Sequence, residues 1–117
     1  MKSKNDNAKY TDRLNIIKEY KQYLLMLEKV LENVPKKDYI CRSNFYNDSI
    51  DVLRLIYYAN NLEGDERLKI QKDIIARISV LDFYIERLIV LKHITSGSAT
   101  KISNQLIKIR KMIYGWL

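Results

Sequence analysis

The amino-acid sequence predicts an all-α protein that folds as an antiparallel, up-down-up-down four-helix bundle. Of its 117 residues, 47% are hydrophobic and 30% are charged, but only three are Gly and one is Pro, which is too few turn residues for many short strands. Apolar residues recur every three or four positions in four segments, the spacing of one helix face. Short connections between these segments favour antiparallel neighbours. We therefore expect one domain, residues 11–117, after a flexible basic segment, residues 1–10.

The first helix is expected from about Thr11 to Asn33. Thr11 or Asp12 can accept a hydrogen bond from a free amide of the first turn and so cap the helix. Pro35 ends it, because proline breaks a helix interior. The apolar stripe of this helix is Ile17, Tyr20, Leu24, Leu27, Leu31 and Val34.

The second helix is expected from Tyr39 or Ser43 to Asn60. Residues 60–65 then form a turn, because Asn and Gly tolerate the left-handed backbone conformation found at helix ends. The apolar stripe expected on this helix is Tyr46, Ile50, Leu53 and Tyr57, beside Val52, Ile56 and Ala59.

The third helix is expected to be the longest, from about Glu66 to His93. Its stripe is Ile74, Ile78, Leu81, Ile85 and Leu88. Further residues make this helix apolar over more than one face, namely Ile75, Val80, Phe83, Tyr84, Ile89 and Leu91.

The fourth helix is expected to begin after the break at residues 95–98, which also supply its cap, and to end near Tyr114. Trp116, the only tryptophan, continues the apolar stripe of this helix, so we expect it to seal the open end of the bundle. Gly115 is expected to let the backbone turn close against a neighbour. The stripe is Ile102, Leu106, Ile109, Ile113 and Trp116.

The charge balance indicates a polyanionic partner. The formal charge is +7 and the pI is about 9.5, so the surface attracts polyanions, of which nucleic acid is the commonest. Lys and Arg are spread over the whole length, unlike a single basic amphipathic membrane-binding segment. No apolar run reaches about eighteen residues, the length of a membrane span, and the polar start argues against a secretory signal. We therefore expect a cytoplasmic protein with no membrane contact.

The sequence contains no pattern typical of a metal or cofactor site. Cys41 is the only cysteine, so an intrachain disulfide and a zinc site with several thiolates are both excluded. The sequence also lacks a Gly-rich phosphate loop and any pair of His or Cys residues at metal-ligand spacing. We expect no metal and no cofactor.

Basic residues of the fourth helix are the main candidates for nucleic-acid contact. Lys101, Asn104, Lys108 and Lys111 recur every three or four residues away from the apolar stripe, so they can follow phosphates. Contact of this kind is mainly independent of sequence and weakens with salt. The alternative is that these lysines serve only solubility. Tyr39 is the best candidate for stacking on a base. Second-rank basic residues are Lys36, Lys37 and Arg42, in and after the first loop. Lys2, Lys4, Lys9 and Arg13 add charge near the N-terminus.

One pair of residues raises the alternative of an enzyme. Arg87 and His93 read R-x5-H, which resembles the Arg-x(4 to 6)-His pair of HEPN-type ribonucleases. That resemblance implies proton transfer by the histidine and phosphate binding by the arginine. A histidine in the last turn of a helix can instead interact with the final carbonyls and the helix dipole. The carboxylates elsewhere alternate with basic residues at helical spacing, as on a solvated surface.

Four stretches of the chain occur in an order that is typical of one family. They are "VPKKDY" after the first helix, "LRLIYYANN" ending the second, "RLKIQKDIIARISVLDFYIERL" in the third and "IRKMIYGWL" closing the fourth. Over roughly residues 20–117 the chain resembles the Avd family, the accessory proteins of diversity-generating retroelements. These are related to four-helix-bundle proteins encoded in intervening sequences of bacterial large-subunit ribosomal RNA. The family commonly ends in Ile-x-x-Met/Leu-Leu-Gly-Gly-Trp, which is matched by Ile109, Met112, Ile113, Gly115 and Trp116.

The resemblance implies a homopentameric barrel of bundles with a basic surface. Such a protein associates with the reverse transcriptase of the element, binds its template RNA and is not itself an enzyme. The chain departs from the family pattern at Tyr114, in place of a glycine, at Asp82 and Glu86, where many members carry arginines, and at residues 43–46. We predict a non-catalytic, oligomeric accessory protein that binds RNA or DNA. The alternatives are a small HEPN-like ribonuclease and a helical assembly protein without nucleic-acid binding.

Overall fold

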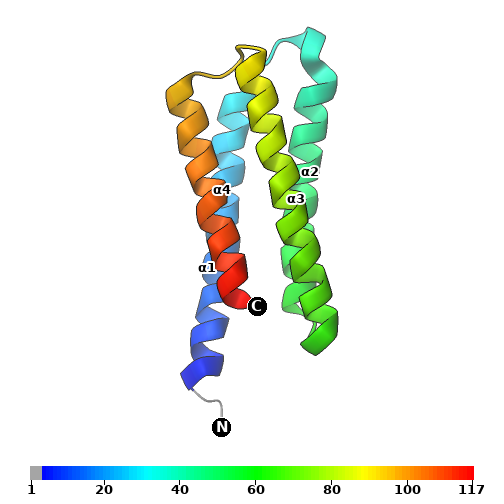
Figure 1. Ribbon diagram of the computed structural model, residues 1–117, viewed down its shortest axis with the longest axis vertical. Coiled ribbons are helices and arrows are strands. Elements are labelled where there is room, and N and C mark those ends of the chain that lie inside the picture. The colour runs from blue at the N-terminus through cyan, green and yellow to red at the C-terminus, as the bar shows by residue number, and fades with distance from the viewer. Residues whose placement is uncertain (1–3) are drawn as a thin grey trace.

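The protein is an elongated bundle of four helices (Figure 1). The computed structural model describes residues 4–117, with side chains from residue 15 onward, and this part of the chain contains no strand. The predicted all-α fold is confirmed. The helices are α1 (Lys4–Leu31), α2 (Tyr39–Asn60), α3 (Gly64–Val90) and α4 (Ser96–Trp116), with a short 3-10 helix, η1 (Lys36–Asp38), before α2.

The four helices form a square in which each packs against its two neighbours. The neighbouring pairs are α1 with α2, α2 with α3, α3 with α4, and α4 with α1, while the backbones of the diagonal pairs do not approach each other closely over the described residues. In Figure 1, α1 and α3 run upwards, and α2 and α4 run downwards. The predicted up-down-up-down order is therefore present, and the bundle measures 55 × 24 × 17 Å.

Helix α1 begins earlier than the sequence pattern indicated. It starts at Lys4, so Thr11 and Asp12 lie inside the helix and neither residue is its N-cap. Residues 4–10 contain neither Gly nor Pro, so nothing in this stretch breaks a helix. Of the predicted flexible segment, residues 4–10 are helical and residues 1–3 lie outside the described part of the chain. The basic side chains of Lys2, Lys4, Lys9 and Arg13 also lie outside it.

The stripes predicted for the first, third and fourth helices are confirmed, because every member is buried. The stripe predicted for α2 is wrong. Ile50 and Tyr57 are 38% and 41% exposed, and Tyr46 and Leu53 are only partly buried. Val52, Ile56 and Ala59, which were predicted beside that stripe, are buried as expected. The full set of buried side chains on α2 is Phe45, Ser49, Val52, Leu55, Ile56 and Ala59.

A polar cluster in the core explains why α2 is rotated in this way. Ser49 is fully buried, and its backbone carbonyl accepts a hydrogen bond from the Tyr20 hydroxyl. Its hydroxyl lies 2.8 Å from that of Tyr23. Burial raises the pKa of both tyrosines above the usual value, so both hydroxyls stay protonated. A buried hydroxyl without a partner is costly, and the hydroxyls of Tyr20 and Tyr23 on α1 are both buried. Ser49 has to face α1 to bond to both of them, and this sets the buried face of α2.

The C-terminus of α3 ends in a Schellman motif. The amide of His93 donates to the carbonyl of Leu88, and the amide of Lys92 donates to that of Ile89. Lys92 has φ 61°, a left-handed conformation that usually requires glycine. The sequence pattern placed His93 in the last turn of the helix. In the structure it lies beyond the end of α3. Its side chain contacts the carboxylate of Asp38, which joins the two connections at the upper end of Figure 1.

Trp116 is buried at the opposite end of the bundle, with 3% of its surface exposed. The guanidinium of Arg67 lies 5.9 Å from the centre of its ring, and the buried amide of Gln71 lies 3.5 Å from its backbone carbonyl. The expectation for Gly115 is wrong within a single chain, because a Cβ there would meet nothing within 4 Å. Ile109 and Ile113 are buried beside the tryptophan, and Met112 is partly buried.

Neither a membrane span nor a metal cluster is found in the described part of the chain. None of its helices combines the length and the apolar character needed to cross a bilayer. Over the same residues, no three His, Cys, Asp or Glu side chains come together as metal ligands could.

Candidate nucleic-acid interface

Positive charge is concentrated at the C-terminal end of the sequence. Residues 91–117 contain five Lys or Arg residues and no Asp or Glu, so they carry +5 of the net +7. Residues 39–90 instead hold eight acidic and seven basic residues, which nearly cancel. Helix α4 therefore provides the strongest attraction for a polyanion. The five basic residues are Lys92, Lys101, Lys108, Arg110 and Lys111.

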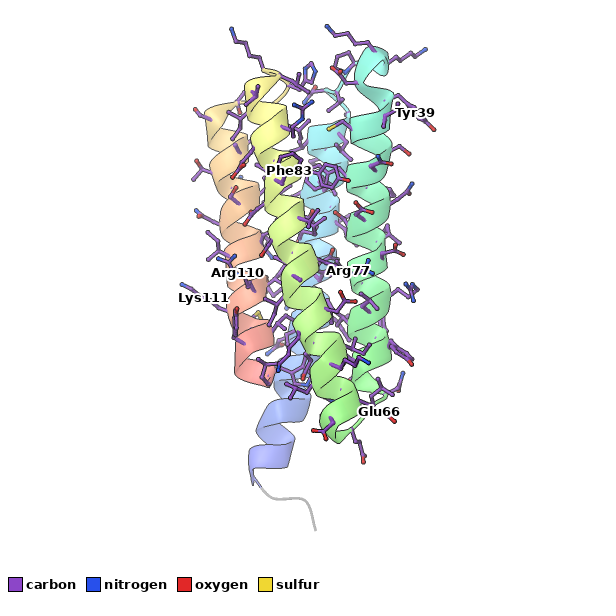
Figure 2. All side chains as sticks on the ribbon, turned by 45° about the vertical axis from the view of Figure 1, so that its right-hand side comes forward. Tyr39, Glu66, Arg77, Phe83, Arg110 and Lys111 are labelled. Carbon is purple, nitrogen blue, oxygen red and sulfur yellow. The ribbon has the colours of Figure 1, made fainter. Side chains whose placement is uncertain are left out.

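Lys101, Lys108 and Lys111 lie on the outer face of α4. All three are exposed, and the buried stripe of α4 faces the other way. Lys101 and Lys111 are ten residues apart, which is about 15 Å along a helix. Figure 2 shows Lys111 extending away from the bundle. No ion pair joins Lys101 or Lys111 to a residue whose side chain is described. These two predicted residues are therefore available to phosphates.

Lys108 differs from its two neighbours because it is already paired. Its ammonium lies 3.2 Å from the carboxylate of Glu19 on α1. The side-chain amide of Gln105 donates to the same carboxylate and to the Glu19 carbonyl, both at 2.9 Å. Hydrogen bonds from Gln105 and then Lys108 lower the pKa of the Glu19 carboxyl. Lys108 thus fastens α4 to α1, and its charge is partly neutralised.

Arg110 lies on the other side of α4, against α3. It is partly buried, and its charge acts on Asp82 of α3. Partial burial raises the pKa of the Asp82 carboxyl, and Arg110 opposes this rise. Asp82 is therefore directed into the α3–α4 seam, whereas Glu86 is exposed. The periodicity of the lysine row did not indicate this pair, because Arg110 falls outside the row.

The second-rank basic residues lie on a separate face. Lys36 and Lys37 are exposed on η1, and Arg42 and Tyr39 are exposed in the first turns of α2. Helices α2 and α4 are diagonal in the bundle, so this group does not extend the α4 row.

Arg87 and His93 have different partners. His93 contacts Asp38, and the side chains of the two are 12% and 23% exposed. Arg87 is exposed near the end of α3, and its charge acts on Cys41 of α2. Burial raises the pKa of the Cys41 thiol, and Arg87 opposes this rise. No described hydrogen bond or ion pair links Arg87 to His93. The sequence did not indicate Asp38 as a partner, because it is 55 residues away from His93.

The fold and the charge distribution define a helical bundle with exposed basic residues on the outer face of α4 and, separately, around η1 and the start of α2. Comparisons with protein-family models, with curated proteins and with solved structures find no match to the chain. The resemblance to the Avd family therefore stays a prediction from the residues.

Proposed function

We propose that the protein is a non-catalytic nucleic-acid-binding accessory protein whose main contact surface is the outer face of α4. The observation that carries this proposal is the concentration of +5 charge, without any acidic residue, in residues 91–117. Lys101 and Lys111 are exposed on that face, and no ion pair joins their ammonium groups to a side chain that the structure describes. Contact with phosphates releases counterions, so binding is independent of base sequence and weakens as salt is raised.

Charge reversal at two positions tests this proposal. The double variant Lys101→Glu/Lys111→Glu is expected to bind RNA roughly tenfold more weakly at low salt, with a salt slope smaller by about 1.4, because each phosphate contact to a single strand contributes about 0.7. Lys108 is left unchanged, because a glutamate there would face Glu19 and disturb the α1–α4 contact. Fluorescence anisotropy at several salt concentrations measures both quantities.

The matched control is Lys69→Glu/Lys72→Glu on α3, which changes the net charge by the same amount at two exposed positions. This variant is expected to retain much more affinity. Equal weakening by both variants would show that only net charge matters, and the α4 face would lose its assignment.

The resemblance to the Avd family extends the proposal to a homopentameric ring that brings a reverse transcriptase and its template RNA together. An apolar row on α3 supports assembly. Val80, Phe83 and Val90 are 51%, 55% and 72% exposed, so the part of the chain that the structure describes leaves at least half of each side chain uncovered. Apolar side chains gathered on one outer face are typical of protein contact surfaces.

The ring predicts a mass in solution of five times the 14.0 kDa chain. Sedimentation equilibrium measures this mass, and Phe83→Asp is expected to lower it, because a carboxylate cannot be buried unpaired in a contact. A single-chain mass for the unaltered protein would exclude the ring.

The two alternatives give different results in the same RNA assays. A ribonuclease using Arg87 and His93 would cleave the RNA and lose that activity in His93→Ala. A helical assembly protein would form the oligomer without RNA affinity. We prefer the binding protein because Lys101 and Lys111 are exposed on one face of α4 and form no ion pair with a described side chain.

A further inference from the structure

A groove lies between the C-terminal part of α1 and the N-terminal part of α2. This groove is open to solvent, and its volume is about 970 Å³, near the upper end of the roughly 300–1,000 Å³ usual for ligand pockets. The α1 side provides carboxylates and a leucine, and the α2 side provides aromatic, cationic and amide groups. The lining residues are Glu28, Leu31, Glu32, Lys36, Tyr39, Arg42, Ser43, Tyr46 and Asn47.

Tyr39 offers this groove an aromatic surface. Its side chain is 64% exposed, and Figure 2 shows it projecting outward near the N-terminus of α2. No described residue stacks on its ring. Aromatic rings exposed beside cationic side chains are the platforms on which unpaired bases stack in single-strand-binding proteins.

Cations lie next to this ring. Lys36 lies on η1, three residues before Tyr39, and Arg42 lies on α2, three residues after it. Tyr39 and Arg42 therefore occupy neighbouring positions on one face of α2. Neither Lys36 nor Arg42 has an ion pair with a residue whose side chain is described. A nucleotide whose base lies on Tyr39 would therefore bring its phosphate close to two cations.

The α1 side of the groove suits the edge of a base and not a phosphate. Glu28 accepts a hydrogen bond from the Tyr46 hydroxyl at 3.0 Å, and Glu32 is an exposed carboxylate beside it. Carboxylates repel phosphate but accept hydrogen bonds from the amino groups of bases. The side-chain amide of Asn47 is a further group that can pair with a base edge.

We propose that this groove binds one unpaired nucleotide of the RNA. Its base stacks on Tyr39, its phosphate lies at Lys36 and Arg42, and its base edge faces Glu32. The inference rests on the proposed function and specifies it further. The α4 face would bind paired and unpaired strands alike, whereas the groove accepts only a base that is free to leave the stack.

Tyr39→Ala tests the groove. The probe is a short unpaired RNA containing 2-aminopurine, compared with a duplex of the same sequence. Tyr39→Ala is expected to bind the unpaired RNA roughly tenfold more weakly, because one stacking contact is lost. It is expected to bind the duplex with unchanged affinity. The quenching of 2-aminopurine fluorescence on binding should disappear in this variant and persist in Tyr39→Phe, which keeps the ring.

Ile40→Ala is the matched control, because Ile40 is the next residue, is 73% exposed and does not line the groove. It should bind both RNAs as the unaltered protein does. If Tyr39→Ala binds both RNAs normally while Lys101→Glu/Lys111→Glu weakens both, the groove inference fails and the proposed function stands. If the unaltered protein binds neither RNA, both fail.

Discussion

Replacing Trp116 by alanine is expected to lower the free energy of unfolding by about 3 kcal/mol, at the low end of the range for buried tryptophans. The ring is 3% exposed and lies in line with the buried stripe of α4, so its removal opens a cavity at the end of the bundle. The contact with Arg67, 5.9 Å from the ring centre, is lost as well. A ring at the end of a bundle can be partly replaced by neighbouring side chains, which limits the cost.

Urea unfolding followed by circular dichroism at the helix band measures this change. Tryptophan fluorescence cannot be used, because the variant has no tryptophan. Tyr114→Ala is the control: Tyr114 is two residues away and 55% exposed, so its loss should change stability by less than about 0.5 kcal/mol. Similar losses for Trp116→Ala and Tyr114→Ala would contradict the sealing role.

Replacing Phe45 by alanine is expected to cost about 4 kcal/mol. The Phe45 side chain is fully buried, and its ring is stacked on that of Tyr84 with 5.0 Å between centres and 13° between planes. Truncation removes this stacking and leaves a cavity between α2 and α3. The hydroxyl of Tyr84 donates to Asp48 at 2.7 Å, which holds the ring in place and keeps it from filling the space.

The same urea experiment measures this loss, with Leu53→Ala as the control on α2. Leu53 belongs to the stripe that the sequence predicted but the structure leaves only partly buried. Leu53→Ala is therefore expected to cost clearly less than Phe45→Ala. The opposite order would mean that α2 is rotated toward the predicted stripe.

The periodicity of apolar residues was sufficient for three of the four helices, because hydrophobic residues mark their buried faces and the buried Gln71 only extends the α3 stripe by one turn. On α2 it failed for a physical reason. The true stripe contains Ser49, whose hydroxyl is compatible with the core only because Tyr23 of another helix lies 2.8 Å away. A partner 26 residues distant has no effect on local spacing, so the fully apolar stripe through Ile50 was the better match to the pattern.

The candidate interface was also predictable only in part. The lysine row of α4 could be placed on an outer face because a helix exposes the side opposite its apolar stripe. The pairing of Lys108 with Glu19 could not be predicted, because it depends on which helix closes the square. The groove beside Tyr39 likewise requires the end of α1 to lie against the start of α2, although Lys36, Tyr39 and Arg42 were each recognised from the sequence.

The square arrangement also has a consequence for biosynthesis. Three of its four sides join helices that are consecutive in the chain, but the fourth joins α1 to α4 across contacts such as Gln105 to Glu19, 86 residues apart. Closing so long a loop is the entropically most demanding contact in the bundle. On the ribosome, α1, α2 and α3 can pair as they emerge, but the apolar stripe of α1 stays uncovered on one side until α4 has also emerged. The nascent chain should therefore be most prone to aggregation in the interval between the emergence of α3 and that of α4.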